Sequence, residues 1–179
     1  MNHKEKNRIR AASFDDTYAI GINSGLADYK LACQINRKLS IDFSRQDDII
    51  ADGVTYSFYY YTAGENCLVY NLVLVKKEDK TLLDFSPRLD YLLIVRNCIM
   101  SQRIDAIVKS LREIEGVGYA FQLDVAKGKS VKQALEIIEL QEIDLLEKIR
   151  VRNTLGYVRQ ELLRQKEASP WMESEASWR

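Results

Sequence analysis

A long helical pattern near the C-terminus is the strongest constraint on how this chain can fold. Within residues 129–166, apolar side chains recur at helical spacing, at Val131, Leu135, Ile138, Ile143, Leu146, Ile149, Leu155, Val158 and Leu162. A helix rises by about 1.5 Å per residue, so this one would extend about 57 Å, well past a domain built from the remaining residues. Gly156 is the weakest point of the pattern, and we expect a kink or a break there.

The residues before this helix alternate between strand and helix patterns. Strand patterns occupy 17–22, 54–61, 67–75, 90–95 and 117–125, and amphipathic helix patterns occupy 26–39 and 101–115. The nearly all-apolar segment 90–95 is typical of a central strand covered on both faces. This order predicts an α+β fold: a two-layer sandwich with a mainly antiparallel sheet and helices on one face. The opposite face must then be wet or covered by something else.

We divide the chain into four segments. Residues 1–14 are expected to form a mobile basic arm, and residues 15–126 the α+β domain. Residues 127–168 are the helical extension, which Ser169-Pro170 stops. Residues 169–179 form a polar tail that holds Trp171 and Trp178 and cannot bury them alone.

The cysteines indicate a cytoplasmic protein, and the charge balance argues against two classes of protein. Cys33, Cys67 and Cys98 are odd in number and form no CxxC pair, so we expect three reduced thiols. No apolar run suits a secretory signal or a membrane span. The 26 basic and 26 acidic residues balance, which argues against a uniformly basic nucleic-acid binder and against an acidic disordered chain.

Side chains for common catalytic and metal sites are scarce. His3 is the single histidine, which excludes a histidine triad or a multi-histidine metal site. The acidic residues at 15–16, 47–48 and 52 match no known cation-binding loop. Asp90 opens an apolar strand, where a carboxylate more often accepts backbone N–H groups from the preceding turn than acts in catalysis. We therefore predict no enzyme activity, no cofactor and no metal.

An aromatic run lies within the strand pattern 54–61. Because side chains alternate along a strand, one face carries Tyr56, Phe58 and Tyr60, and the other carries Tyr59 and Tyr61. One face can pack on the helices. The other is either a platform on which bases stack or a half-buried strand surface.

Charges segregate along the helical extension. The acidic residues come first, at Glu136, Glu139, Glu142, Asp144 and Glu147. Between 148 and 166, six basic residues oppose the single acid Glu161. Such a helix can pair with a partner helix, or with its own copy in antiparallel fashion, so that acidic halves meet basic halves. It can also dock its basic half on nucleic-acid phosphates, or simply be solvated.

From Tyr18 to about Glu136 the sequence resembles the IPExxxVDY family of small bacterial proteins. The resemblance rests on Leu83, Leu89, Asp90 and Tyr91, on Ile20-Gly21-Ile22-Asn23-Ser24, on Asp28-Tyr29-Lys30-Leu31 and on Gln34-Ile35-Asn36. Asp84 and Phe85 stand where the family name has Pro and Glu. The family has no assigned catalytic residues, so the resemblance implies a bacterial protein and no particular reaction.

These observations predict a non-enzymatic protein–protein interaction module, an adaptor or subunit of a larger cytoplasmic assembly. It would bury one apolar set against another protein or its own copy, namely Ile149, Leu155, Val158, Leu162, Trp171 and Trp178. The alternative is a nucleic-acid-associated protein that uses Arg150, Arg152, Arg159, Tyr59 and Tyr61. Neither interpretation includes a membrane or a small-molecule substrate.

Overall fold

The computed structural model of the chain describes residues 16–64 and 67–168, with the side chains of 161–163 and 165–168 excepted. Its internal contacts divide the chain into two units, Met1–Ile138 and Glu139–Arg179. The last helix, α3 (Lys129–Ala168), begins in the first unit and continues through the second.

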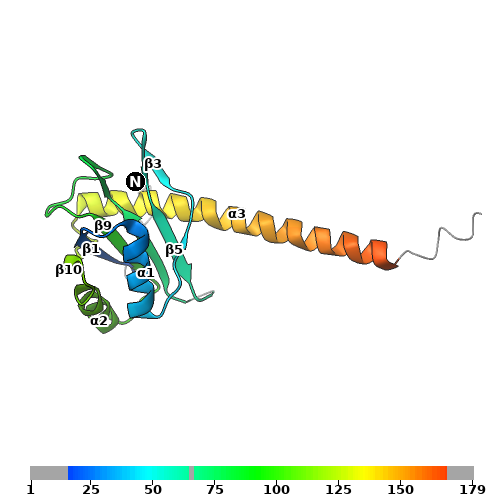
Figure 1. Cartoon of the computed structure of the whole chain (residues 1–179), viewed down its shortest axis with the longest axis horizontal. Coiled ribbons are helices and arrows are strands. Elements are labelled where there is room, and N and C mark those ends of the chain that lie inside the picture. The colour runs from blue at the N-terminus through cyan, green and yellow to red at the C-terminus, as the bar shows by residue number, and fades with distance from the viewer. Residues whose placement is uncertain (1–15, 65–66, 169–179) are drawn as a thin grey trace, which may run out of the picture. The chain divides into compact units, whose positions relative to one another are not determined.

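A six-stranded antiparallel sheet forms the centre of the first unit (Figure 1). Its strand order is β10-β1-β9-β6-β5-β2, and all neighbouring strands pair antiparallel. The strands are β1 (Tyr18–Ser24), β2 (Ser44–Arg45), β5 (Phe58–Thr62), β6 (Val69–Leu74), β9 (Tyr91–Arg96) and β10 (Val117–Leu123). Two small hairpins pair β3 (Ile49–Ala51) with β4 (Val54–Tyr56), and β7 (Lys76–Lys77) with β8 (Lys80–Thr81). The α+β fold predicted from the sequence is confirmed.

Two amphipathic helices cover one face of this sheet, α1 (Asp28–Leu39) and α2 (Ser101–Arg112) (Figure 1). Their buried side chains recur every three or four residues, so each helix presents one apolar face to the core. Leu31 and Ile35 of α1 and Ile104 of α2 are fully buried in one cluster with the strands. Each such side chain contributes about 1.5–3 kcal/mol by leaving water.

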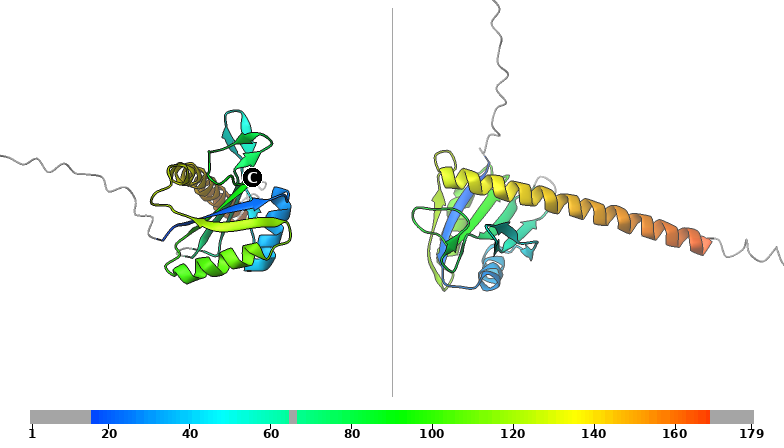
Figure 2. Two further views of the ribbon diagram at one scale, coloured as in Figure 1. Left: turned by 90° about the vertical axis from the view of Figure 1, so that its left-hand side faces the viewer. Right: turned by 90° about the horizontal axis from the view of Figure 1, so that it is seen from above.

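The central strand β9 is buried on both of its faces, as its apolar sequence predicts. Leu92 and Leu93 point to opposite faces, and both have no exposed surface. The first turns of α3 lie across the face opposite α1 and α2 (Figure 2). There the helix buries Val131, Leu135 and Ile138. The first unit therefore extends to Ile138, past residue 126, because it includes this second cover.

The aromatic run expected as one strand over 54–61 is divided between two strands. Val54–Tyr56 pairs with β3 in a separate hairpin, whereas Phe58–Thr62 pairs with β6 in the main sheet. Ser57 separates them and donates its hydroxyl hydrogen bond to Asp28 at the start of α1. The predicted hairpin of β5 and β6 is confirmed.

The expected kink at Gly156 is absent, and α3 is helical on both sides of it. Glycine raises the free energy of a helix by about 1 kcal/mol relative to alanine, which the long flanking helical segments tolerate. Within residues 16–64 and 67–168, no helix combines the length and the hydropathy that crossing a membrane requires.

We expect Gly156→Ala to strengthen α3 locally. No atom lies within 4 Å of a Cβ added there, so only the difference in helix propensity remains. A gain of about 1 kcal/mol would slow amide hydrogen exchange near residue 156 about fivefold. The matched control is Gly25→Ala, which also meets open space but lies outside α3. Equal rates of amide hydrogen exchange near residue 156 in the two variants would contradict the expectation.

Candidate functional site

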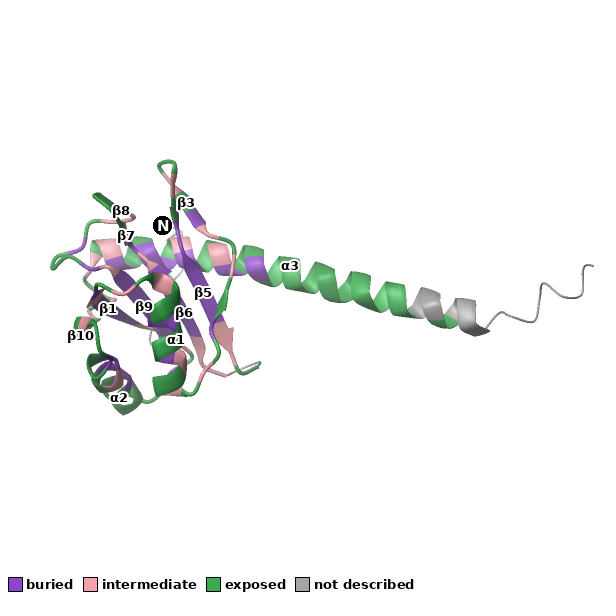
Figure 3. Cartoon of the chain, viewed as in Figure 1, coloured by how far each residue is buried: buried purple, intermediate pink, exposed green. Residues whose placement is uncertain are grey.

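Residues 146–160 of α3 are all exposed (Figure 3), and their large apolar side chains lie at several angles around the helix, at Leu146, Ile149, Val151, Leu155, Tyr157 and Val158. Part of this set follows one side. Val151 is 51% exposed, Leu155 63% and Val158 48%, and Leu162 continues the same spacing on the helix backbone. The spacing of four, three and four residues keeps these positions on one side of a helix with 3.6 residues per turn. We call Val151, Leu155, Val158 and Leu162 the α3 stripe.

The residues predicted to bind a partner do not all belong to this stripe. Leu155, Val158 and Leu162 do, whereas Ile149 lies roughly 120° away from Leu155 around the helix axis. Trp171 and Trp178 lie outside the described residues. Val151 is not among the residues predicted to bind a partner, although its distances of four and seven residues to Leu155 and Val158 indicate the same side of the helix.

The three arginines of the nucleic-acid alternative are exposed but do not share one face. Arg152 and Arg159 are seven residues apart and flank the same edge of the α3 stripe, whereas Arg150 lies on the other side of the stripe. None of the described residues forms an ion pair with Arg152 or Arg159.

The expected base-stacking platform on β5 needs correction. Tyr59 is only 5% exposed, because its ring packs edge-on against Phe43 under α1, with centroids 6.5 Å apart. Tyr61 is half-buried and stacks at a tilt on Tyr70, with centroids 6.2 Å apart. The opposite side of the strand is also buried, so β5 does not present the two tyrosines for stacking.

A polar cluster joins the start of α1 to β5. Asp28 Oδ2 accepts hydrogen bonds from Ser57 Oγ at 2.5 Å and from the Tyr59 hydroxyl at 3.2 Å. Arg45 Nη1 lies 3.4 Å from the same oxygen, and its Nη2 bonds Asp48 at 2.9 Å. Asp28 is the first residue of α1, where a negative charge also suits the helix dipole.

The pKa values in this cluster follow from burial and hydrogen bonding. Burial alone would raise the pKa of Asp28, but the hydrogen bonds from Ser57, the Tyr29 backbone and Tyr59, with the charge of Arg45, lower it below the usual value. Burial, together with the carboxylate of Asp28, raises the pKa of Tyr59 to about 12. Both groups therefore keep fixed protonation states at neutral pH, as in a structural contact.

Asp90 holds two neighbouring strands together. Its Oδ2 accepts hydrogen bonds from Asn23 Nδ2 at 2.6 Å and from the Ser24 backbone N–H at 3.0 Å, and Lys76 Nζ lies 3.7 Å from Oδ1. The donors come from the end of β1, and not, as predicted from the sequence, from the turn before β9. The carboxylate thus has a structural role.

The segment 83–91, which carries part of the family resemblance, leads from β8 into β9. Leu89 is 2% exposed and packs on Gly21 of β1, where an added Cβ would lie 2.7 Å from the leucine side chain. Phe85, at the position of the family glutamate, is 7% exposed. This segment therefore contributes to packing.

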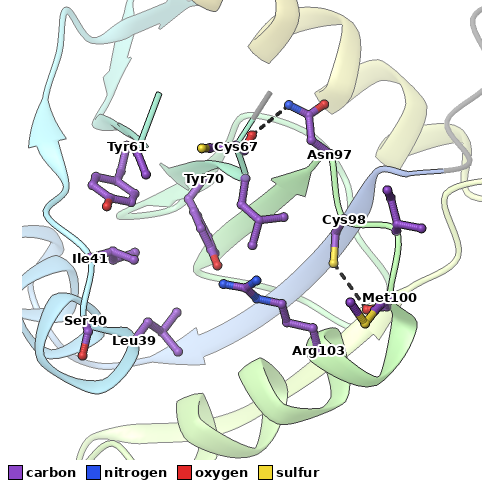
Figure 4. Close-up of a pocket in the computed structure, with 13 residues that line it drawn as sticks. Leu39, Ser40, Ile41, Tyr61, Cys67, Tyr70, Asn97, Cys98, Met100 and Arg103 are labelled. Carbon is purple, nitrogen blue, oxygen red and sulfur yellow. Dashed lines mark hydrogen bonds between the residues drawn. The ribbon is translucent and has the colours of Figure 1, made fainter. Parts of the chain in front are cut away.

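A pocket of about 440 Å³ opens between the end of α1, the β5–β6 hairpin and the start of α2 (Figure 4). Leu39 and Ile41 form part of its apolar wall, and the guanidinium of Arg103 points toward the Tyr70 hydroxyl. Burial raises the pKa of Tyr70, and Arg103 opposes that effect. The described lining has no Asp, Glu or His, so it offers no carboxylate or imidazole as a general base.

Metal binding and disulfides receive no support from the geometry. In the part of the chain that the structure describes, no three His, Cys, Asp or Glu side chains gather as metal ligands would. The cysteines are free: Cys33 is exposed, Cys67 half-buried and Cys98 buried.

No protein-family model matches the chain, and no curated protein is significantly similar to it. The resemblance to the IPExxxVDY family stays a prediction.

We expect Asp28→Asn to lower the free energy of unfolding by about 1 kcal/mol at pH 7, because charged hydrogen bonds are lost at a partly exposed site. The folded-state pKa of Asp28 is lowered, so its stabilisation is complete above the unfolded pKa of about 3.9. It is lost as the pH falls through the lower folded pKa. The difference between the two proteins should therefore shrink below about pH 4.

Urea denaturation at pH 7 and across the acidic range measures this difference. Asp42→Asn is the matched control, because Asp42 is exposed and forms no hydrogen bond or ion pair with any residue that the structure describes. A loss of stability that stays constant with pH would contradict the assigned role of the carboxylate.

Proposed function

We propose that this protein is a non-enzymatic interaction module, an adaptor or subunit of a larger cytoplasmic assembly, and that it docks on another polypeptide through the α3 stripe. The observation that carries the proposal is the row of exposed apolar side chains on α3. Val151, Leu155 and Val158 are each about half exposed or more. A contiguous apolar row on a helix is typical of helix pairing and of helix-in-groove recognition.

The energy for docking would come from covering this row. Each apolar side chain that leaves water contributes about 25 cal/mol per Å² of buried surface, before the cost of association is subtracted. Ile149 lies on another side of the helix and is 36% exposed, so it would contribute only to a partner that wraps around α3.

The nucleic-acid alternative has weaker support. Arg152 and Arg159 are exposed and favour an anionic partner. However, Tyr59 is buried, Tyr61 is half-buried, and both lie on β5 in the other unit. We therefore place a polypeptide, rather than RNA or DNA, on α3.

Site-specific photo-cross-linking in cells tests the proposal on the full chain. A benzophenone amino acid at Thr154, at the edge of the α3 stripe, should form protein adducts at least about fivefold more often than one at Asn153, on the opposite side. Both positions are exposed. The adducts should disappear when Leu155 is changed to Glu, because a charge in the contact prevents apolar burial.

The identity of the adduct decides between the two functions. Protein adducts that depend on Leu155 support the proposal. Equal labelling from both positions, or adducts with nucleic acid, would contradict it.

A further inference from the structure

The proposed function leaves the partner of the α3 stripe open, and the pattern around the stripe identifies one. We propose that the partner is a second copy of this chain, and that the α3 helices of the copies pair in parallel over residues 147–166. This inference rests on the proposed function and makes it more specific.

The apolar spacing is that of a coiled-coil seam. In a heptad labelled a to g, Leu155 and Leu162 occupy position a, and Val151 and Val158 occupy position d. Intervals of four, three and four residues match the alternation that keeps a and d facing a partner helix. α3 is helical throughout this stretch, so its backbone presents the seam without rearrangement.

The charges beside the seam determine the orientation. Position g holds Glu147, Thr154 and Glu161, and position e holds Arg152, Arg159 and Lys166. In a parallel pair, g of one helix lies beside e of the next heptad on the other. Glu147 therefore meets Arg152 in both directions across the symmetric interface, and Glu161 and Lys166 repeat the same spacing in the sequence.

An antiparallel pair would bring e beside e and g beside g. Arg152, Arg159 and Lys166 would then face one another, and like charges side by side oppose association. The register thus argues against the antiparallel self-pairing considered from the sequence.

The described charged side chains beside the seam are accessible. Glu147, Arg152 and Arg159 are exposed, and no ion pair with a described residue engages the two arginines. Lys148, at position a, precedes the apolar seam, and Gln165, at position d, follows it, so the seam is about two heptads long. Association should therefore be weak and depend on concentration.

Engineered cysteines in the full chain test the orientation. Val151→Cys and Val158→Cys should each form a disulfide with the same residue of another copy, at least about tenfold faster than Gln160→Cys on the opposite side. Cys33→Ser is included in all three, because Cys33 is exposed. A parallel seam links both positions, whereas an antiparallel one brings at most one of them to its own copy. Rates no faster than that of Gln160→Cys, or linkage at only one position, would overturn the proposal.

Charge exchange tests the pairing independently. Arg152→Glu should weaken self-association about fivefold in sedimentation experiments, and adding Glu147→Lys should restore it, because the opposite charges face each other again. Self-association through the seam should raise the sedimentation mass above the 20.7 kDa of one chain as the concentration increases. A chain that stays monomeric would contradict the inference.

The two proposals fail in different ways. If the chain stays monomeric while Thr154 still cross-links to a different protein, the self-pairing is wrong and the docking function stands. If the Thr154 adducts are also absent, both are wrong.

Discussion

Burial of the sheet on both of its faces is the constraint on which the first unit depends. β9 lies between β1 and β6, and Leu92 and Leu93 lose all their exposed surface on opposite faces. One helical layer cannot cover both, so α1 and α2 require a second cover, which the first turns of α3 supply. Removing those turns would expose a wide apolar surface to water, and the helix is for this reason part of the core as far as Ile138.

The sequence predicted the elements better than their long-range contacts. The all-apolar segment at 90–95 and the spacing of Leu31 and Ile35 reflect local periodicity, which a single sequence displays. The second cover of the sheet and the contact of Ser57 with Asp28 depend on residues far apart in the chain, which periodicity does not encode. The continuity of α3 across Gly156 was missed because one glycine weighs about 1 kcal/mol against many helical neighbours.

The same distinction explains the corrected sites. The alternation of side chains along β5 correctly placed Tyr59 and Tyr60 on opposite faces of the strand. It could not tell which face would be covered, and in the structure both Tyr59 and Tyr60 are buried. The α3 stripe, in contrast, follows from helix geometry alone, so three of its four residues were identified from the sequence. Ile149, which was predicted to bind a partner with them, lies at another angle around the axis, which an apolar count does not register.

Two charge patterns coexist on α3, one along the helix and one beside the seam. They favour opposite orientations of a partner helix, and the pattern whose charges lie nearer the seam has the larger effect. Acidic residues precede basic ones along the helix, which favours an antiparallel partner. However, Glu136, Glu139 and Glu142 occupy positions c, f and b of the heptad, away from the seam, and Asp144, at position d, is paired with Lys148 of its own helix. Interactions between exposed charges weaken beyond a Debye length of about 8 Å. In the proposed pair, by contrast, Glu147 and Arg152 border the seam itself and would meet across it. The charges that would face the partner across the seam therefore outweigh the acidic-to-basic order along α3, and the parallel arrangement is favoured.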